Sequence, residues 1–199
     1  YNCLKNSAKQ FYYKKDDEMY IMAGYPWLNV RARDELMALP GCTLSIDHKK
    51  DFETIMDTLV SALQRYINTG EKHRNIKEID LPDISLWAIW AIQQYKRAYG
   101  NEECLEKYGH VVKYLVEAIR EERIYNLYLN DNGLLSTNGQ NSPVTWLSAT
   151  VNGRPIIPRT GYIVEYNALW YNALRFLISL YESDKASAAY LLELEALAD

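Results

Sequence analysis

The sequence is poor in the residues from which metal and disulfide sites are built. Its 199 residues include only three cysteines and three histidines. The cysteines, Cys3, Cys42 and Cys104, are odd in number and widely spaced, which fits neither a disulfide framework nor a zinc site. The histidines have no carboxylate or second histidine at metal-ligand spacing. We therefore expect no metal, and we expect the cysteines to be buried small residues in a reducing compartment, the cytoplasm.

Long apolar runs and basic stripes are also missing. No apolar stretch approaches the roughly 18 residues that a membrane span requires, and no signal-peptide segment opens the chain. The net charge is −4, and lysine and arginine are scattered along the sequence. These features predict a protein that binds neither membrane nor nucleic acid.

Phenylalanine is scarce, whereas other aromatic residues are abundant. The chain has 3 Phe against 17 Tyr and 5 Trp, and 48% of its residues are hydrophobic. Rings that also carry a hydrogen-bonding group suit wet, concave surfaces that stack flat ligands, although Tyr serves equally well at half-buried positions. Composition thus indicates a globular domain and leaves these two uses of tyrosine open.

Strand patterns are rare, and most of the chain has helical periodicity. Beyond a polar helical start at 1–17, helices are predicted at 32–39, 51–68, 84–100, 102–129, 164–183 and 186–198. The run MYIMAGYPWL is strand-like, and VNGRP offers the Asn-Gly turn of a small hairpin. We predict an all-α protein forming a single domain over 1–199. The irregular stretch between about 129 and 163 is long enough to favour a functional loop.

Four clusters of polar and aromatic residues could carry chemistry, and each has a plain structural alternative. A ring beside the Arg33 and Asp34 pair could bind a sugar, or the pair could simply cap a helix. Tryptophan at helical spacing is more often core, and a first-turn carboxylate is stabilised by the helix dipole. Because three clusters follow loops at helix starts, we expect them to converge on one face. The clusters are Tyr25 to Trp27 with Arg33 and Asp34; Asp83, Trp87, Trp90 and Gln94; Trp146, Ser148, Arg154 and Arg159; and Glu165, Asn167, Trp170 and Asn172.

Five motifs in order resemble a known family. They are AGYPWL, RARDELMALPGCTL, LPDISLWAIWAIQQY, NGLL and TWLSATVNGRPIIPRTGYIVEYNALWYNAL, and they span roughly residues 20 to 176. This series is similar to the amylo-alpha-1,6-glucosidase domain of glycogen debranching enzymes. The resemblance implies an (α/α)6 toroid that binds glycogen or a branched α-glucan. It also implies inverting hydrolysis of α-1,6-linked glucosyl stubs by two carboxyl groups, without metal or cofactor.

The resemblance also assigns roles to individual residues. The Arg33 and Asp34 pair would hold glucose hydroxyls, and Asp83 matches an acidic residue that opens the next inner helix. The remaining substrate contacts are polar positions and rings of the pocket wall. They are Arg159, Glu165, Asn167, Tyr25, Trp27, Trp146 and Trp170.

Three departures from the family pattern accompany these assignments. Ser148 occupies the position of the aspartate that serves as general acid in the family's TWMDA motif, and a hydroxyl cannot protonate a leaving group as a carboxylic acid can. Ala32 replaces a glycine found in many relatives. The chain has helices for only about half of the ring, which implies a missing C-terminal half with the catalytic base, or self-association. A non-catalytic glucan-binding protein and a helical interaction scaffold are therefore retained as alternatives.

Overall fold

A computed structural model describes residues 2–182, 184 and 187–198. The chain divides into two compact units, Tyr1–Asp80 and Leu81–Asp199, and each is described by itself. Seven α-helices occur among the described residues, and all strands are short. The prediction of a mainly helical chain is confirmed, whereas the toroid and the single domain stay predictions.

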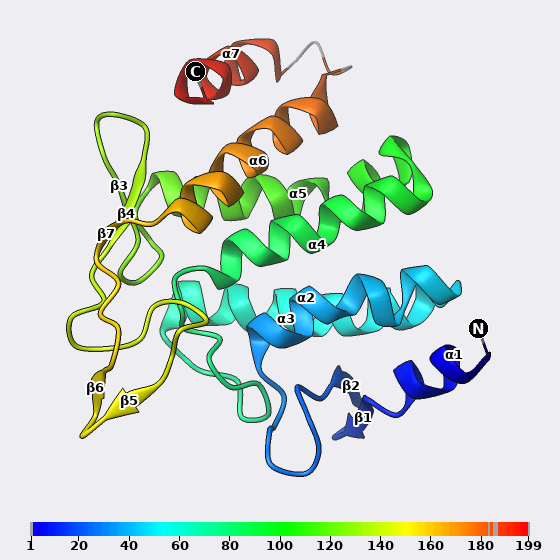
Figure 1. Ribbon diagram of the computed structural model, residues 1–199. Helices are drawn as coiled ribbons and strands as arrows, with labels where there is room; N and C mark the ends of the chain where they lie inside the picture. Colours follow the sequence, from blue (N-terminus) through cyan, green and yellow to red (C-terminus); the bar gives the residue numbers. More distant parts are fainter. Residues whose placement is uncertain (1, 183, 185–186, 199) are drawn as a thin grey trace. The chain divides into compact units, whose positions relative to one another are not determined.

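The first unit contains a β-hairpin and two packed helices (Figure 1). The predicted helix over 1–17 is wrong beyond Lys9, because residues 12–21 form the hairpin instead. Asp16 and Asp17 have φ of 55° and 65°, the left-handed backbone that a two-residue hairpin turn requires. The elements are α1 (Asn2–Lys9), β1 (Tyr12–Lys15), β2 (Glu18–Ile21), α2 (Ala32–Cys42), η1 (Leu44–Ile46) and α3 (Lys49–Thr69).

The core of this unit forms where α3 packs against β2 and α2. Phe52, Ile55 and Leu59 share one face of α3 and are at most 2% exposed. Burying a side chain of this size contributes about 1.5–3 kcal/mol. The helix ends at Gly70, whose φ of 75° terminates it near the position that the sequence predicts.

The second unit is a group of helices with small sheets at one end. Helix α4 packs against α5 and α6, α5 packs against α6, and α6 against α7 (Figure 1). The helices are α4 (Ile84–Tyr99), α5 (Asn101–Arg120), α6 (Val164–Tyr181) and α7 (Ala188–Ala198). The strands are β3 (Tyr128–Leu129), β4 (Leu135–Thr137), β5 (Thr150–Val151), β6 (Arg154–Pro155) and β7 (Gly161–Tyr162).

The irregular stretch before α6 holds more order than the sequence indicates. Helix α5 ends at Arg120 rather than near 129, because Glu122 and Asn126 adopt left-handed φ of 53° and 59°. Strands β3, β4 and β7 form one antiparallel sheet. The predicted Asn-Gly hairpin is confirmed as β5–β6, since Asn152 and Gly153 both have positive φ.

Cysteine exposure agrees only partly with the sequence prediction. Cys104 is buried and Cys42 is half-buried, but Cys3 is exposed, so the prediction is wrong for Cys3. It lies on α1, none of whose residues is buried. Within the described ranges, no helix combines the length and apolarity needed to cross a membrane.

Candidate functional site

The Trp146 pocket is a hollow of about 390 Å³ in the loop before α6. The backbone N–H of Ile156 donates to the Ala149 carbonyl at 3.0 Å, which ties the end of the β5–β6 hairpin to the preceding segment. Trp146 is 64% exposed, so its ring stands at the rim of a mainly apolar wall. Only the Ser148 side chain adds a hydroxyl to this wall. The lining residues are Trp146, Leu147, Ser148, Ala149, Ile156 and Ile157.

Arg159 and Glu165 form a forked ion pair beside Trp146. Arg159 donates from Nη1 to Oε1 of Glu165 at 2.6 Å and from Nη2 to Oε2 at 2.8 Å. Arg159 lowers the pKa of Glu165 to about 2, and the Trp146 indole adds a smaller hydrogen-bonding contribution. Glu165 is therefore ionised at neutral pH. Trp146 and Arg159 are thus brought to Glu165 at the start of α6. The convergence of the helix-start clusters on one face stays a prediction.

Asn167 and Trp170 lie on the same helix, but their polar groups contact the protein backbone. Asn167 Oδ1 accepts from the Leu135 N–H at 2.8 Å, and its Nδ2 donates to the carbonyls of Leu135 and Ile163, both at 3.0 Å. Trp170 is 2% exposed and donates from Nε1 to the Gly133 carbonyl at 3.2 Å. Both side chains fasten the β3–β4 hairpin to α6, and their contact with a glucan stays a prediction.

A second asparagine, which the sequence did not single out, holds the other end of β4. Asn126 Nδ2 donates to the Asn138 carbonyl at 2.8 Å, and its Oδ1 accepts from the Asn138 N–H at 2.9 Å. Asn126 and Asn167 thus each bind both backbone groups of one residue beside or within β4. The only local sign in the sequence is that asparagine tolerates the left-handed backbone found here.

Asp83 occupies the N-cap position of α4, as the sequence predicts, but its side chain makes no capping hydrogen bond. The side chain is 3% exposed, and its Oδ2 accepts from the Trp87 indole at 3.2 Å. The rings of Trp87 and Trp90 meet edge to face with centroids 5.5 Å apart. Trp87, Trp90 and Gln94 are half-buried, so the cluster is not part of the buried core, and a substrate contact by Asp83 stays a prediction.

The predicted contacts of the first unit differ in exposure. Trp27 is 84% exposed, and Tyr25, which is 52% exposed, helps to line a hollow of about 370 Å³. Arg33 is buried, whereas Asp34 is exposed and lies 3.4 Å from Nε of Arg31. Arg31 also pairs with Glu78 at 2.5 Å, and a shared role of Arg33 and Asp34 in holding hydroxyls stays a prediction.

Comparison with known proteins decides the family. The sequence matches the amylo-alpha-1,6-glucosidase family over residues 6–194. The chain belongs to the amylo-alpha-1,6-glucosidase family. No match was found among curated proteins or among solved structures.

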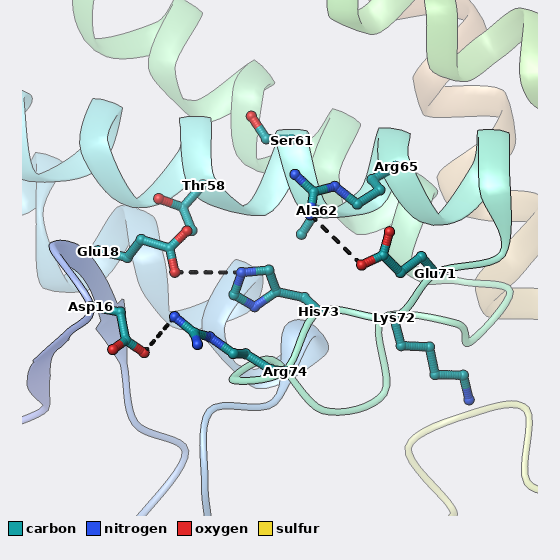
Figure 2. A pocket seen from close by; sticks show the side chains of 10 residues that line it. All are labelled: Asp16, Glu18, Thr58, Ser61, Ala62, Arg65, Glu71, Lys72, His73 and Arg74. Atoms are coloured by element: carbon teal, nitrogen blue, oxygen red, sulfur yellow. Dashed lines mark ion pairs between the residues drawn. The ribbon is translucent and has the colours of Figure 1, made fainter.

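This amylo-alpha-1,6-glucosidase family member also has a polar hollow of about 340 Å³ in its first unit, which we call the His73 pocket (Figure 2). Arg74 pairs with Asp16 at 2.9 Å, and Nε2 of His73 lies 3.4 Å from Oε2 of Glu18. No pattern in the sequence groups these residues. The lining residues are Asp16, Glu18, Thr58, Ser61, Ala62, Arg65, Glu71, Lys72, His73 and Arg74.

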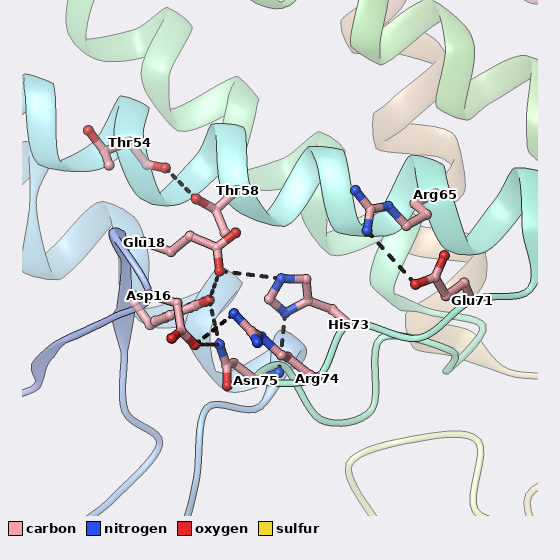
Figure 3. Close-up of polar contacts among 10 residues, drawn as sticks. Asp16, Glu18, Thr54, Thr58, Arg65, Glu71, His73, Arg74 and Asn75 are labelled. Atoms are coloured by element: carbon pink, nitrogen blue, oxygen red, sulfur yellow. Dashed lines mark hydrogen bonds and ion pairs between the residues drawn. The ribbon is translucent and has the colours of Figure 1, made fainter.

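The contacts within the His73 pocket indicate that its residues have a structural role. The Asn75 N–H donates to Nδ1 of His73 at 3.3 Å, and its Nδ2 donates to Asp16 at 3.3 Å (Figure 3). Lys72 pairs with Asp80 at 2.5 Å. These contacts tie the β1–β2 turn to the segment that follows α3. Since cations and carboxylates pair with each other, the pocket offers no excess charge to an ionic ligand.

Metal-ligating side chains do not gather in the described part of the chain. Among those residues, no group of three or more His, Cys, Asp or Glu could hold a metal ion. The side chains at and beside the Trp146 pocket supply one exposed indole, one hydroxyl, one ion pair and apolar contact.

Proposed function

We propose that this chain acts in glycogen debranching and binds α-1,6-linked glucosyl stubs of a branched α-glucan at the Trp146 pocket. The observation that carries the proposal is the forked Arg159–Glu165 pair, which lies beside the exposed Trp146 indole that also lowers the pKa of Glu165. A sugar ring has an apolar face and a hydroxyl edge. An indole suits the face, and an ion pair supplies donors and acceptors to the edge.

The family supports the reaction class, and we propose the finer mechanism from it. Inverting hydrolysis requires one carboxyl group to protonate the leaving oxygen and another to activate water, with roughly 6.5–9.5 Å between them. We further propose that the consecutive helices belong to an (α/α)6 toroid in the cytoplasm, and that Tyr25, Trp27, Arg33, Asp34 and Asp83 add substrate contacts.

Glu165 is suited to binding rather than to proton donation. A general acid must hold its proton near neutral pH, which requires a raised pKa. The pKa of Glu165 is instead lowered to about 2 by Arg159. We therefore assign Glu165 and Arg159 to the substrate hydroxyls, and we place no general acid at Ser148.

A second candidate is a non-catalytic glucan-binding protein. The observation that favours it is Ser148, which lines the pocket where the resemblance places an acidic residue. In this case the chain would bind a branched glucan without releasing glucose. The helical scaffold, the remaining alternative, would leave the exposed Trp146 without a ligand.

Binding and turnover measured on one sample test these alternatives. We expect tryptophan fluorescence to change on addition of branched limit dextrin, and Trp146→Ala to weaken binding at least about tenfold, a loss of roughly 1.4 kcal/mol. Tyr125→Ala is the matched control, because Tyr125 is also an exposed aromatic residue of the second unit, at 68%. Equal binding by Trp146→Ala and Tyr125→Ala would contradict the proposed site.

Glucose release then separates hydrolysis from binding alone. Release from limit dextrin by the unmodified chain supports the hydrolase, and binding without release supports the second candidate. If only the acid is lacking, Ser148→Asp should raise release by about 10²–10⁴-fold, the usual contribution of general acid catalysis. Ser148→Asn has a similar shape without an acid and should give no rise.

A further inference from the structure

Gly139 lies against the backbone of Arg159. A methyl group on its Cα would stand 2.9 Å from both the nitrogen and the carbonyl carbon of Arg159, and closer still to the carbonyl oxygen. These are backbone atoms, so they cannot turn away as a flexible side chain would. Only glycine fits at this position without displacing Arg159.

The segment that carries Gly139 is fixed on both sides. The Gly139 N–H donates to Oγ1 of Thr160 at 3.1 Å, and Thr137 pairs with Gly161 between β4 and β7. Asn126 holds the neighbouring Asn138 through both of its backbone groups. Arg159 therefore rests on a supported segment rather than on a free loop.

The same strand is fastened to the helix that bears Glu165. Asn167, two residues after Glu165 on α6, binds the N–H and the carbonyl of Leu135 in β4. The start of β4 is thus bound to α6, the helix that carries Glu165. Gly139, which follows the other end of β4, contacts the backbone of Arg159.

We propose that Gly139 is a positioning residue of the Trp146 pocket, which seats the Arg159 guanidinium on the Glu165 carboxylate by leaving room for the Arg159 backbone. Its effect on glucan binding rests on the function proposed above, whereas its effect on the ion pair does not. A forked pair needs two aligned hydrogen bonds, so a shift of the Arg159 backbone should break at least one of them.

The test is the titration of Glu165 in chains of residues 1–199 labelled with carbon-13 at glutamate side-chain carboxyls. In the unmodified chain Glu165 should titrate at about 2, and in Gly139→Ala the midpoint should move toward the ordinary value of 4.5. Arg159→Gln gives the reference for complete loss of the pair. Gly41→Ala is the matched control, because a methyl group there meets nothing within 4 Å, and it should leave the midpoint unchanged.

Glucan binding is measured on the same variants. We expect Gly139→Ala to weaken binding at least fivefold. A folded Gly139→Ala chain whose Glu165 still titrates at about 2 overturns the proposal. If the moved midpoint is found but the unmodified chain binds no glucan, the proposed function fails and the positioning role stands.

A second variant covers the case in which Gly139→Ala does not fold. Thr160→Val keeps the shape of the side chain but removes the oxygen that accepts from the Gly139 N–H. Its Glu165 midpoint should rise in the same direction by a smaller amount. An unchanged midpoint in Thr160→Val would then overturn the proposal.

Discussion

Two glutamates of this chain occupy opposite environments. Glu165 is half-exposed and is held ionised by Arg159. Glu35 is fully buried in the first unit, where its Oε1 accepts from the Ile21 N–H at 2.7 Å. No hydrogen bond reaches its Oε2 in the described part of the chain, and burial raises the pKa of Glu35 well above its ordinary value. The fold therefore favours the neutral form of this residue.

Glu35→Gln should stabilise the first unit at neutral pH. With a folded-state pKa above the unfolded one, the stability linked to Glu35 is complete below the unfolded value and is lost as pH rises through the folded value. Glutamine does not titrate and keeps an oxygen for the Ile21 N–H. We expect the free energy of unfolding at pH 7 to rise by about 1–2 kcal/mol, measured with urea.

The pH dependence distinguishes this effect from a general change in charge. The gain from Glu35→Gln should shrink as pH falls toward 4, where the buried carboxyl of the unmodified chain is neutral. Glu106→Gln makes the same change at an exposed position and should leave stability nearly unchanged. A gain from Glu35→Gln that is constant with pH would show that ionisation is not the cause.

At the scale of elements, asparagine side chains bind backbone groups at both ends of β4. Asn167→Ala removes three hydrogen bonds and leaves the backbone groups of Leu135 without these partners. We expect the free energy of unfolding to fall by about 2–3 kcal/mol, because buried backbone groups that lose a partner are costly. Chemical denaturation followed by circular dichroism provides the measurement.

Asn172→Ala is the control on the same helix. Alanine favours helix at both positions, so the propensity gain is common to the two variants and cancels in their comparison. Asn172 should therefore tolerate the change or gain slightly. If Asn167→Ala is no less stable than Asn172→Ala, the strand is not held by the Asn167 amide.

The sequence predicted the elements that have strong local signals. Helix α3 has a regular apolar face and ends at a glycine, and both features are visible in the residues alone. The β1–β2 turn and the end of α5 were missed, because aspartate, glutamate and asparagine adopt left-handed backbone there without any glycine to mark it. Helical periodicity was extended through both places as a result.

The candidate site could be predicted only where residue chemistry is explicit. The Trp146 pocket follows from indole, guanidinium and carboxylate groups that stand in one motif. The roles of Asn126 and Gly139 depend on backbone groups brought close by folding, 12 and 20 residues away along the chain. The identity of a residue does not indicate which distant backbone group it will contact, so the roles of these two positions could not be predicted from the sequence.

At the scale of the whole molecule, each compact unit has its own buried core. If the cores are independent, Glu35→Gln should slow amide hydrogen exchange within residues 1–80, and Asn167→Ala should speed it within 81–199. Hydrogen exchange followed by mass spectrometry measures both variants against the unmodified chain. Changes that spread through both ranges in either variant would instead support the single domain predicted from the sequence.

The hydrogen bonds from the Asn126 and Asn167 side chains to the backbone at β4 also determine which positions can be substituted. The Asn126 side chain binds backbone groups of Asn138, and the Asn167 side chain binds backbone groups of Leu135 and Ile163. These contacts therefore do not depend on the side chains at the bound positions. Position 135 needs only an apolar residue. Position 138 can be substituted without loss of its backbone hydrogen bonds to the Asn126 side chain. Asn126 and Asn167 cannot be substituted in this way. Aspartate at either position would place a negatively charged oxygen against the carbonyl that now accepts from Nδ2. Slow deamidation of either amide would thus release the strand without breaking the chain.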